Sequence, residues 1–353
     1  MKKLSMLFIA LLIFITGCTR QDAIENQPMI STLTIQDYYP FRENLLMQYI
    51  GVNNEFSEKR IFTEFSEGNR IQIKTTYNDY SMVRVLEYEN GELREIYSED
   101  KFYHIENVLR KDKTMNNILL KEPLEVGNSW ETHDGYTRTI TGDNVDIDTP
   151  YGNLKALEVT TKFGEGKVQK DYYAAGIGYV GTVYVESGFE IKTLLEKVEE
   201  GPLKMDIRFY YPTIDGRNSA YVNREIEFET NGNITDILEY NMKNPQYDEL
   251  LAVIAEDTDI NSIVLDKGKE IVRIDFSNEI AADVDTEMEI EILKSIVNTI
   301  GSFYKVENVH ISINGEPYSS ESFMLGEDGF FSVDYMGIEE FKETNQRTLK
   351  RVL

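Results

Sequence analysis

The side chains best suited to chemistry are sparse in this chain of 353 residues. It has one cysteine, Cys18, and three histidines, His104, His133 and His310. A zinc site needs several such ligands at short spacings, and these four residues stand far apart in the sequence. His310 alternates within an expected strand, which favours a partly exposed structural role. The sequence therefore predicts no metal site and no bound cofactor.

Two acidic clusters carry the oxygen ligands that calcium prefers. One spans Asp143 to Asp148, and the other spans Asp283 to Asp285. Neither has the central glycine and closing glutamate of a calcium-binding loop. Asp146 alternates with Asp148 on a predicted strand face, and Asp285 stands where a carboxylate favours a helix start. We expect structural roles for these acids.

The sequence lacks the short motifs of the common enzyme classes, such as a nucleophile elbow, a phosphate loop or a dinucleotide fingerprint. The glycine pairs at 164–166 and 176–178 fit hairpin turns. A cell-wall hydrolase would need two carboxylates flanking one cleft, and 62 acidic residues offer such pairs by chance. We therefore predict a non-enzymatic protein with no catalytic residues.

Cys18 has a sequence context of its own. Lys2 and Lys3 precede Leu4 to Ile15, twelve residues in which Ser5 is the polar exception. Such a stretch is too short to span a bilayer, but it fits the core of a signal peptide.

The tetrapeptide Ile15-Thr16-Gly17-Cys18 resembles the bacterial lipobox, whose cysteine is acylated and becomes the new N-terminus. The resemblance implies a signal peptide at 1–17 and lipid attachment at Cys18. Two acyl chains on one residue anchor a protein stably, whereas one chain binds only marginally. A plain secretory signal with a chance cysteine is the alternative.

Charge excludes one class of partner. Cleavage after residue 17 would leave 34 basic against 62 acidic residues, a net charge near −28. Nucleic acids and anionic headgroups repel such a surface, so we expect no nucleic-acid binding and a membrane contact made through the lipid anchor. A single cysteine rules out disulfides within the chain, so packed cores must stabilise the fold.

The mature chain begins with a polar tether at 18–36, followed at 37–200 by an antiparallel all-β domain. Period-two alternation predicts its strands, and turn residues separate them. The clearest strands are 70–76, 82–88 and 154–160, and the clearest turns are 67–69, 89–91, 150–152 and 164–166. Gly176 and Gly178 predict a bulge or tight bend, and Trp130 is a predicted core residue.

Six tyrosines form three adjacent pairs, Tyr38 and Tyr39, Tyr172 and Tyr173, and Tyr210 and Tyr211. Neighbours on a strand point to opposite faces, so we expect one core and one exposed ring in each pair. Sheet packing is the favoured role, and stacking on sugars or partner proteins is the alternative.

A break near Glu199-Glu-Gly-Pro202 separates a second domain, 204–337, from the first. Strands are predicted at 205–211, 220–228, 261–265, 270–275 and 308–313. One or two helices are expected between 236 and 255, interrupted at Asn244-Pro245. A capping box at Thr286 and Glu289 predicts a helix whose apolar stripe is Ile290, Leu293, Val297, Ile300 and Tyr304. Residues 338–353 are predicted to be a charged tail.

The order of these elements resembles the GerM (GerMN) sporulation and spore-germination domain. The matching segments are Phe209-Tyr-Tyr-Pro212, 222–226, 260–268, 272–277, 291–300 and 306–315. Family members usually carry Gly-Pro after the first helix, where this chain has Glu256-Asp-Thr-Asp259. The resemblance implies an α+β, ring-building-motif-like domain that serves non-catalytic assembly outside the cytoplasmic membrane.

The sequence thus indicates a lipid-anchored protein on the extracytoplasmic face of a Gram-positive, spore-forming cell. We expect it to be an assembly or binding module in sporulation or germination, with other envelope or sporulation proteins as partners. A module that binds peptidoglycan or spore-cortex glycans is the first alternative, and a cell-wall hydrolase is the second.

Overall fold

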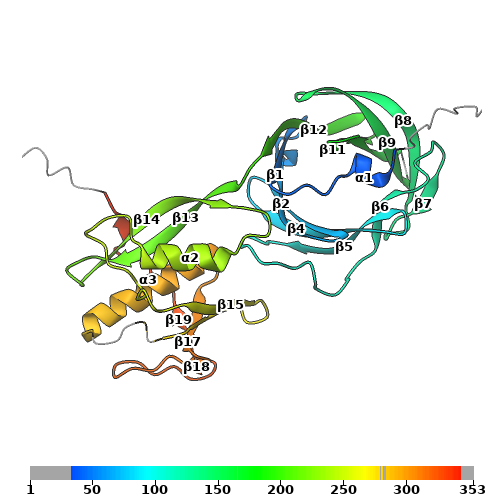
Figure 1. Ribbon diagram of the computed structural model, residues 1–353. Helices are drawn as coiled ribbons and strands as arrows, with labels where there is room; N and C mark the ends of the chain where they lie inside the picture. The colour runs from blue at the N-terminus through cyan, green and yellow to red at the C-terminus, as the bar shows by residue number, and fades with distance from the viewer. Residues whose placement is uncertain (1–32, 165, 279, 281–283, 343–353) are drawn as a thin grey trace, which may run out of the picture. The chain divides into compact units, whose positions relative to one another are not determined.

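The computed structural model describes residues 33–164, 166–278, 280 and 284–342 (Figure 1). Strands dominate up to residue 228, and the two longest helices follow. The predicted fold class, an all-β region followed by an α+β region, is confirmed.

Twelve antiparallel strands of the N-terminal region form one strongly curved, nearly closed sheet. Their spatial order is β6-β5-β4-β3-β2-β1-β12-β11-β10-β9-β8-β7. The strands are β1 (Leu45–Val52), β2 (Lys59–Glu67), β3 (Arg70–Thr76), β4 (Ser81–Glu89), β5 (Glu92–Asp100), β6 (Asn117–Lys121), β7 (Ser129–Glu131), β8 (Thr137–Thr149), β9 (Gly152–Gly164), β10 (Lys167–Ala174), β11 (Gly178–Glu186) and β12 (Phe189–Glu200).

The predicted hairpin turns lie between successive strands of this sheet. Gly68, Gly91 and Gly152 have positive φ, which glycine adopts without the steric cost that other residues meet. At the β10–β11 turn, Gly176 and Gly178 also have positive φ, and the strand register shifts beside Tyr173. The bulge or bend predicted there is confirmed.

Side chains close the seam between the two edge strands, β6 and β7. Trp130 donates its indole N–H to the Ile118 carbonyl oxygen at 3.0 Å, and Arg138 donates to the same oxygen. Asn128 adds a bond of 2.9 Å to the Lys121 carbonyl oxygen. Trp130 is buried, as predicted. The barrel is therefore completed by side-chain donors where no strand ladder runs.

A short helix, α1 (Ile35–Tyr38), lies within the curve of the sheet (Figure 1). Its Asp37 carbonyl accepts from the Gly176 N–H at 2.7 Å, and the Ile35 N–H donates to Glu122 at 3.2 Å. The Asp37 carboxylate also accepts from the Thr34 N–H at 2.7 Å. The predicted tether at 18–36 thus overlaps a packed helix at its last two residues.

The segment 101–116 covers the outer face of strands β2 to β5 through a buried polar network. Glu64 pairs with Lys74 at 2.6 Å, and Gln72 donates to Glu64 at 2.9 Å. Gln72 also accepts from the Val108 N–H at 2.8 Å, and Lys74 donates to the His104 carbonyl oxygen. Buried charges need such partners, so this network fixes where the segment crosses the sheet.

Two sheets and two helices make up the α+β region. Strands β13 (Leu203–Pro212) and β14 (Ser219–Phe228) pair with β20 (Glu339–Glu340), while the second sheet has the order β15-β16-β17-β18, with β19 against β17. Their bounds, with those of the helices, are α2 (Ile234–Lys243), β15 (Ile260–Asp266), β16 (Ile271–Phe276), α3 (Thr286–Tyr304), β17 (Asn308–Ile313), β18 (Glu316–Pro317) and β19 (Phe331–Ser332).

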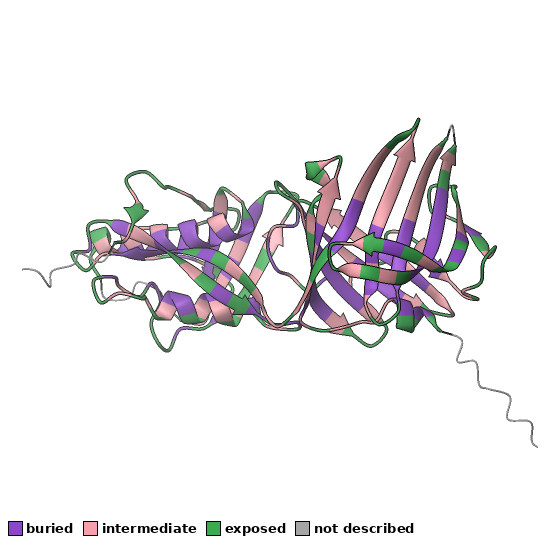
Figure 2. Ribbon diagram, turned by 90° about the horizontal axis from the view of Figure 1, so that it is seen from above, coloured by how far each residue is buried: buried purple, intermediate pink, exposed green. Residues whose placement is uncertain are grey.

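Helix α3 packs its buried side against strands of both sheets, including β13 and β17. Figure 2 shows buried residues along it. The core here is apolar, with Ile274, Phe276, Ile296, Ile300 and Ile311 fully buried. Such packing supplies most of the stability of an amphipathic helix.

Three details differ from the sequence-based expectations. Asp285, not Thr286, caps α3, because its carboxylate accepts from the Met288 N–H at 2.9 Å. Ile290 lies at the edge of the apolar stripe and is 42% exposed. The predicted charged tail begins within the sheet, since β20 pairs with β14. Of the one or two helices expected between 236 and 255, one is present, α2, and it ends before Pro245 as predicted, because the proline ring cannot continue it.

Candidate binding cavity in the barrel

A cavity of about 310 Å³ lies inside the N-terminal barrel, and it is lined by an unusual concentration of charge. Five charged side chains from five strands face it, together with amides, hydroxyls and aromatic rings. The charged members are Lys59, Arg84, Glu95, Arg138 and Asp171, and the others are Tyr39, Ile61, Asn117, Leu119, Gln169, Tyr173, Tyr179, Thr182 and Thr193.

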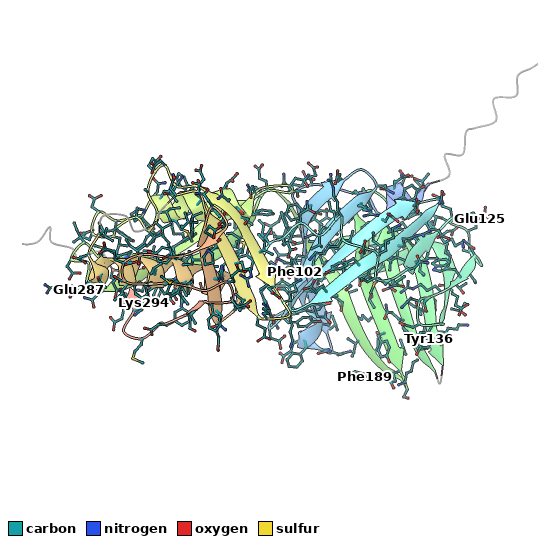
Figure 3. The ribbon with its side chains drawn as sticks, turned by 90° about the horizontal axis from the view of Figure 1, so that it is seen from below. Phe102, Glu125, Tyr136, Phe189, Glu287 and Lys294 are labelled. Carbon is teal, nitrogen blue, oxygen red and sulfur yellow. The ribbon has the colours of Figure 1, made fainter. Side chains whose placement is uncertain are left out.

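The cavity occupies the end of the barrel away from α1. Lys59 and Asn117 begin their strands at that end, next to the hairpin turns, while α1 is bonded to the turns at the other end. Figure 3 shows Tyr136 and Phe189 at hairpin ends, with Glu125 on a different side of the barrel. Phe56 and Phe189, in turns at the cavity end, are exposed.

Of the three cations in the cavity, Lys59 has the fewest compensating interactions. Its Nζ lies 4.8 Å from the Tyr179 ring centroid and 5.3 Å from that of Tyr49. Within the described residues, no carboxylate oxygen lies within 4.0 Å of it. Burial and the Arg84 charge lower the pKa of Lys59 to about 7, against a weaker opposing effect of Asp171. Any anion reaching Nζ would favour its protonated form.

Arg84 is also incompletely bonded. Its Nη2 donates to Thr75 at 3.4 Å, but its buried Nε has no hydrogen-bond partner in the described part of the chain. Burial lowers the pKa of Arg84, while Glu95 and nearby tyrosines raise it more, so the guanidinium stays charged. The guanidinium lines the cavity with one long hydrogen bond and no carboxylate within 4.0 Å among the described residues, so it can still bond a ligand.

The two carboxylates are bonded mainly to neutral donors. Asp171 accepts from Gln169 at 3.0 and 2.9 Å and from the Thr182 hydroxyl. Glu95 accepts from Asn117 at 3.3 Å. When Lys59 is protonated, three cations face two carboxylates, and the cavity is then net positive in a protein of formal net charge −26.

Arg138 differs from the other two cations because its guanidinium is hydrogen-bonded to three groups of the barrel. It donates to Asn117 at 2.9 Å and to Thr161 at 3.3 Å, and it also bonds the Ile118 carbonyl oxygen at the seam. Its role is to hold the barrel closed, which leaves Lys59 and Arg84 as the cations free to meet a ligand.

Three tyrosines of the lining, Tyr39, Tyr173 and Tyr179, form a connected cluster with Tyr49, which packs against Tyr179. Ring centroids are 6.3 Å apart for Tyr39 and Tyr173, 5.8 Å for Tyr173 and Tyr179, and 5.5 Å for Tyr49 and Tyr179. Burial raises the pKa of each phenol, so all stay neutral at physiological pH. They offer ring faces and hydrogen bonds.

The expectation of one exposed ring in each tyrosine pair is wrong. Tyr172 and Tyr173 are both buried, as are Tyr210 and Tyr211. Both faces of these strands are covered, so alternation leads each ring into a packed layer. The outward Tyr172 donates to Glu158 at 2.9 Å. Tyr172, Tyr210 and Tyr211 thus have the favoured packing role, whereas Tyr39 and Tyr173 also line the cavity.

The three histidines considered as metal ligands in the sequence lie outside the cavity lining. His310 is expected to be partly exposed but is buried. Its Nδ1 lies 2.6 Å from the Gly329 carbonyl oxygen, which satisfies this nitrogen inside the fold. His104 is buried with its Nε2 3.1 Å from Glu106, and His133 is exposed. Within the described ranges, no three His, Cys, Asp or Glu side chains are grouped to hold a metal ion.

The acidic clusters have local partners. Asp146 is exposed and pairs with Lys155 at 2.7 Å, and Asp148 accepts from Asn153 at 2.6 Å. Asp285 caps α3. Asp283 and the predicted lipid-attachment residue Cys18 lie outside the described residues.

Comparison with known proteins bears on the α+β region. Residues 208–319 match the Germane family, described as sporulation and spore germination. This segment is a Germane domain. No match was found among curated proteins. The Germane domain spans β13 from Arg208 to the residues after β18, so the segments that carried the resemblance all lie within it.

Some solved structures resemble parts of this chain at low sequence identity. The first GerMN domain of the Bacillus subtilis sporulation protein GerM is 21% identical, with 37% of this chain and 94% of that chain covered and a TM-score of 0.27. The tandem GerMN domains of the same protein give the same identity and TM-score, with 45% of that chain covered. A Bacteroides fragilis protein with a YmcC-like fold is 10% identical, with 46% and 99% covered and a TM-score of 0.31.

Sequence reasoning missed the cavity. Arg84 alternates with valines just as a solvent-facing side chain does, and Lys59 and Asp171 stand beside other charged residues. The available signal was that both faces of several strands carry large apolar residues, which indicates a covered outer face. In the described part of the chain, no helix has both the length and the hydrophobicity needed to cross a membrane.

Proposed function

We propose that this protein is a lipid-anchored, non-catalytic component of the cell envelope that acts as an assembly or binding module in sporulation or spore germination. The Germane domain at 208–319 carries this proposal, since its family is described by that process. The barrel would serve as a second, ligand-binding part of the same module.

The lipobox-like segment ending at Cys18 supports the anchor. The mature chain would have a net charge near −28, which repels anionic headgroups. A protein with this surface needs a covalent tether to stay at a membrane, and diacylated cysteine supplies one.

Exposed apolar side chains on the Germane domain support an assembly role. Tyr240 on α2 is 61% exposed and Ile290 on α3 is 42% exposed, and both lie on regular, rigid elements. Rigid helices that present large apolar groups suit contacts with partner proteins.

The hydrogen bonding of the cavity supports a binding rather than a catalytic role. A glycosidase needs one carboxyl group as proton donor and a second as base or nucleophile. Here Asp171 accepts from Gln169 and Thr182, and Glu95 accepts from Asn117, so both act as acceptors. We expect the protein to leave the turbidity of cell-wall suspensions unchanged.

A chromosomal deletion, complemented by the wild-type gene or by Cys18→Ser, tests the proposal. We expect the deletion to impair sporulation or germination and the wild type to restore it. Cys18→Ser should leave the membrane fraction or remain unprocessed, and restore function poorly. Normal spore yield and normal germination of the deletion strain would contradict the assembly role. A fully processed, membrane-bound Cys18→Ser protein would contradict the anchor.

The tyrosine-walled polar cavity favours a second candidate function, a module that binds peptidoglycan or cortex glycan. Sedimentation of residues 19–353 with purified peptidoglycan tests it. Co-sedimentation that excess soluble wall fragments compete away would support this candidate, and a protein that stays in the supernatant would exclude it.

A further inference from the structure

We propose that the barrel cavity binds a sugar acid of monosaccharide size and holds its carboxylate between Lys59 and Arg84. The inference concerns a site inside the barrel and stands independently of the assembly role of the Germane domain. It goes beyond glycan binding in general because it names the charged group that the site selects.

Cavity size sets the upper limit on the ligand. Its volume, about 310 Å³, is at the small end of the range in which proteins bind small molecules. One six-membered sugar ring with its substituents fits such a space, whereas a disaccharide must leave one ring outside. The cavity lies towards the hairpin turns opposite those that α1 contacts, so we expect a ligand to enter from that end.

The unmatched cations select an acid. Among the described residues, no carboxylate oxygen lies within 4.0 Å of Lys59 Nζ or of the Arg84 guanidinium, and Arg84 makes one long hydrogen bond, of 3.4 Å, to Thr75. A carboxylate bonded by both would replace two missing interactions with charge-assisted hydrogen bonds. Asp171 and Glu95 do not fill this role, because amide and hydroxyl donors occupy them.

The rest of the lining suits hydroxyl groups and the faces of a sugar ring. Asn117, Gln169 and Thr193 bring amide and hydroxyl groups to the cavity, and Asp171 can accept from a sugar hydroxyl. Tyr173 and Tyr179 present aromatic surface on which the apolar face of a sugar packs. An acid with a purely aliphatic body would leave these polar groups unbonded.

Calorimetry on residues 19–353 with matched sugars tests the proposal. N-acetylmuramic acid and N-acetylglucosamine share a ring and differ by a carboxylate-bearing ether, and glucuronate and glucose form a second pair. We expect the acid of at least one pair to bind about tenfold or more tightly than its neutral partner. Equal affinities within both pairs, or no binding of either acid, would overturn the proposal.

Neighbouring residues on β2 provide a matched control. Lys59→Gln removes the cation that faces the cavity, whereas Arg60→Gln removes the next cation, which is exposed and lies outside the cavity lining. We expect Lys59→Gln and Arg84→Gln each to weaken binding of the acid about tenfold or more, with Arg60→Gln unchanged. Circular dichroism verifies folding of each variant. Folded Lys59→Gln and Arg84→Gln proteins that bind with wild-type affinity would refute the site.

Proton uptake gives a readout that a merely structural lysine would not show. Lys59 faces Arg84 from β4, Asp171 from β10 and the phenols of Tyr49 and Tyr179. At pH 8, binding of the acid should take up close to one proton, measured in buffers of different ionisation enthalpy. The uptake should vanish in Lys59→Gln. Binding without proton uptake would show that the carboxylate does not meet Lys59.

Discussion

The interiors of the two regions differ in how much charge they hold. The barrel encloses five charged side chains and a wall of tyrosines, while the Germane domain packs α3 on its sheets with aliphatic and aromatic groups. An apolar core is stabilised by removing surface from water, and it tolerates little change. A cavity lined with polar groups loses part of this hydrophobic stabilisation but leaves those groups available to bind a ligand. The difference indicates which region is built to hold its shape and which is built to bind.

A charge placed in the apolar core of the Germane domain should have the largest effect on the free energy of unfolding. Ile296 on α3 is 0% exposed, so Ile296→Asp would bury an unpaired carboxylate. We expect a loss of about 4 kcal/mol or more in the free energy of unfolding. Urea titration followed by circular dichroism at 222 nm, which reports the helices, measures it. Ile296→Val is the control, with a loss of about 1 kcal/mol. A mild effect of the aspartate would show that this core is wetter than described.

Breaking the buried ion pair between Glu64 and Lys74, on the outer face of the barrel sheet, should have the next largest effect on stability. Glu64 is 0% exposed, and Lys74→Met would leave it unpaired. We expect a loss of about 3 to 5 kcal/mol. The double variant Lys74→Met/Glu64→Leu should recover much of this loss, because it removes the stranded charge. Trp130 is the single tryptophan of the chain, so its fluorescence follows barrel unfolding. A double variant no more stable than Lys74→Met would contradict the pairing argument.

Inside the cavity, a change of charge should have a smaller and pH-dependent effect. The pKa of Lys59 is about 7 when folded, below its ordinary value of 10.5. Between these values the unfolded chain binds the proton and the folded protein does not, so raising the pH favours folding.

Lys59→Met removes this dependence. Relative to the variant, the wild type should gain stability from pH 7 towards pH 10, by on the order of 1 to 2 kcal/mol after solvent screening. Unfolding by urea at several pH values, followed by Trp130 fluorescence, gives the difference. A difference that is flat with pH would show that Lys59 is well solvated.

The smallest effect is expected at the surface of the Germane domain. Ile290→Ser changes a residue that is 42% exposed and should alter stability by about 0.5 kcal/mol or less. Leu293→Ser, one turn further along α3 and buried, is the matched comparison and should cost several-fold more. Equal losses would mean that Ile290 belongs to the core after all.

Sequence patterns could predict the strands, the turns and the main helix because these depend on local periodicity. Arg70 to Thr76 alternates, and glycine or asparagine stands at each hairpin. Periodicity could not identify the cavity. It separates the two faces of a strand, as at Lys59 and Arg60, but the curvature of the whole sheet decides which face is concave. Ile290 fits an i, i+3, i+7 stripe, yet it lies at the edge of the arc that contacts the sheets.

The seam between β6 and β7 also affects the tendency of this protein to aggregate. An open sheet offers the unpaired carbonyls of its edge strands to any chain that can add a strand, which is a common beginning of aggregation. Here Trp130 and Arg138 both donate to the Ile118 carbonyl oxygen, so an incoming strand would find that acceptor already occupied. Two side chains thus help to protect the barrel from polymerising through its own edge.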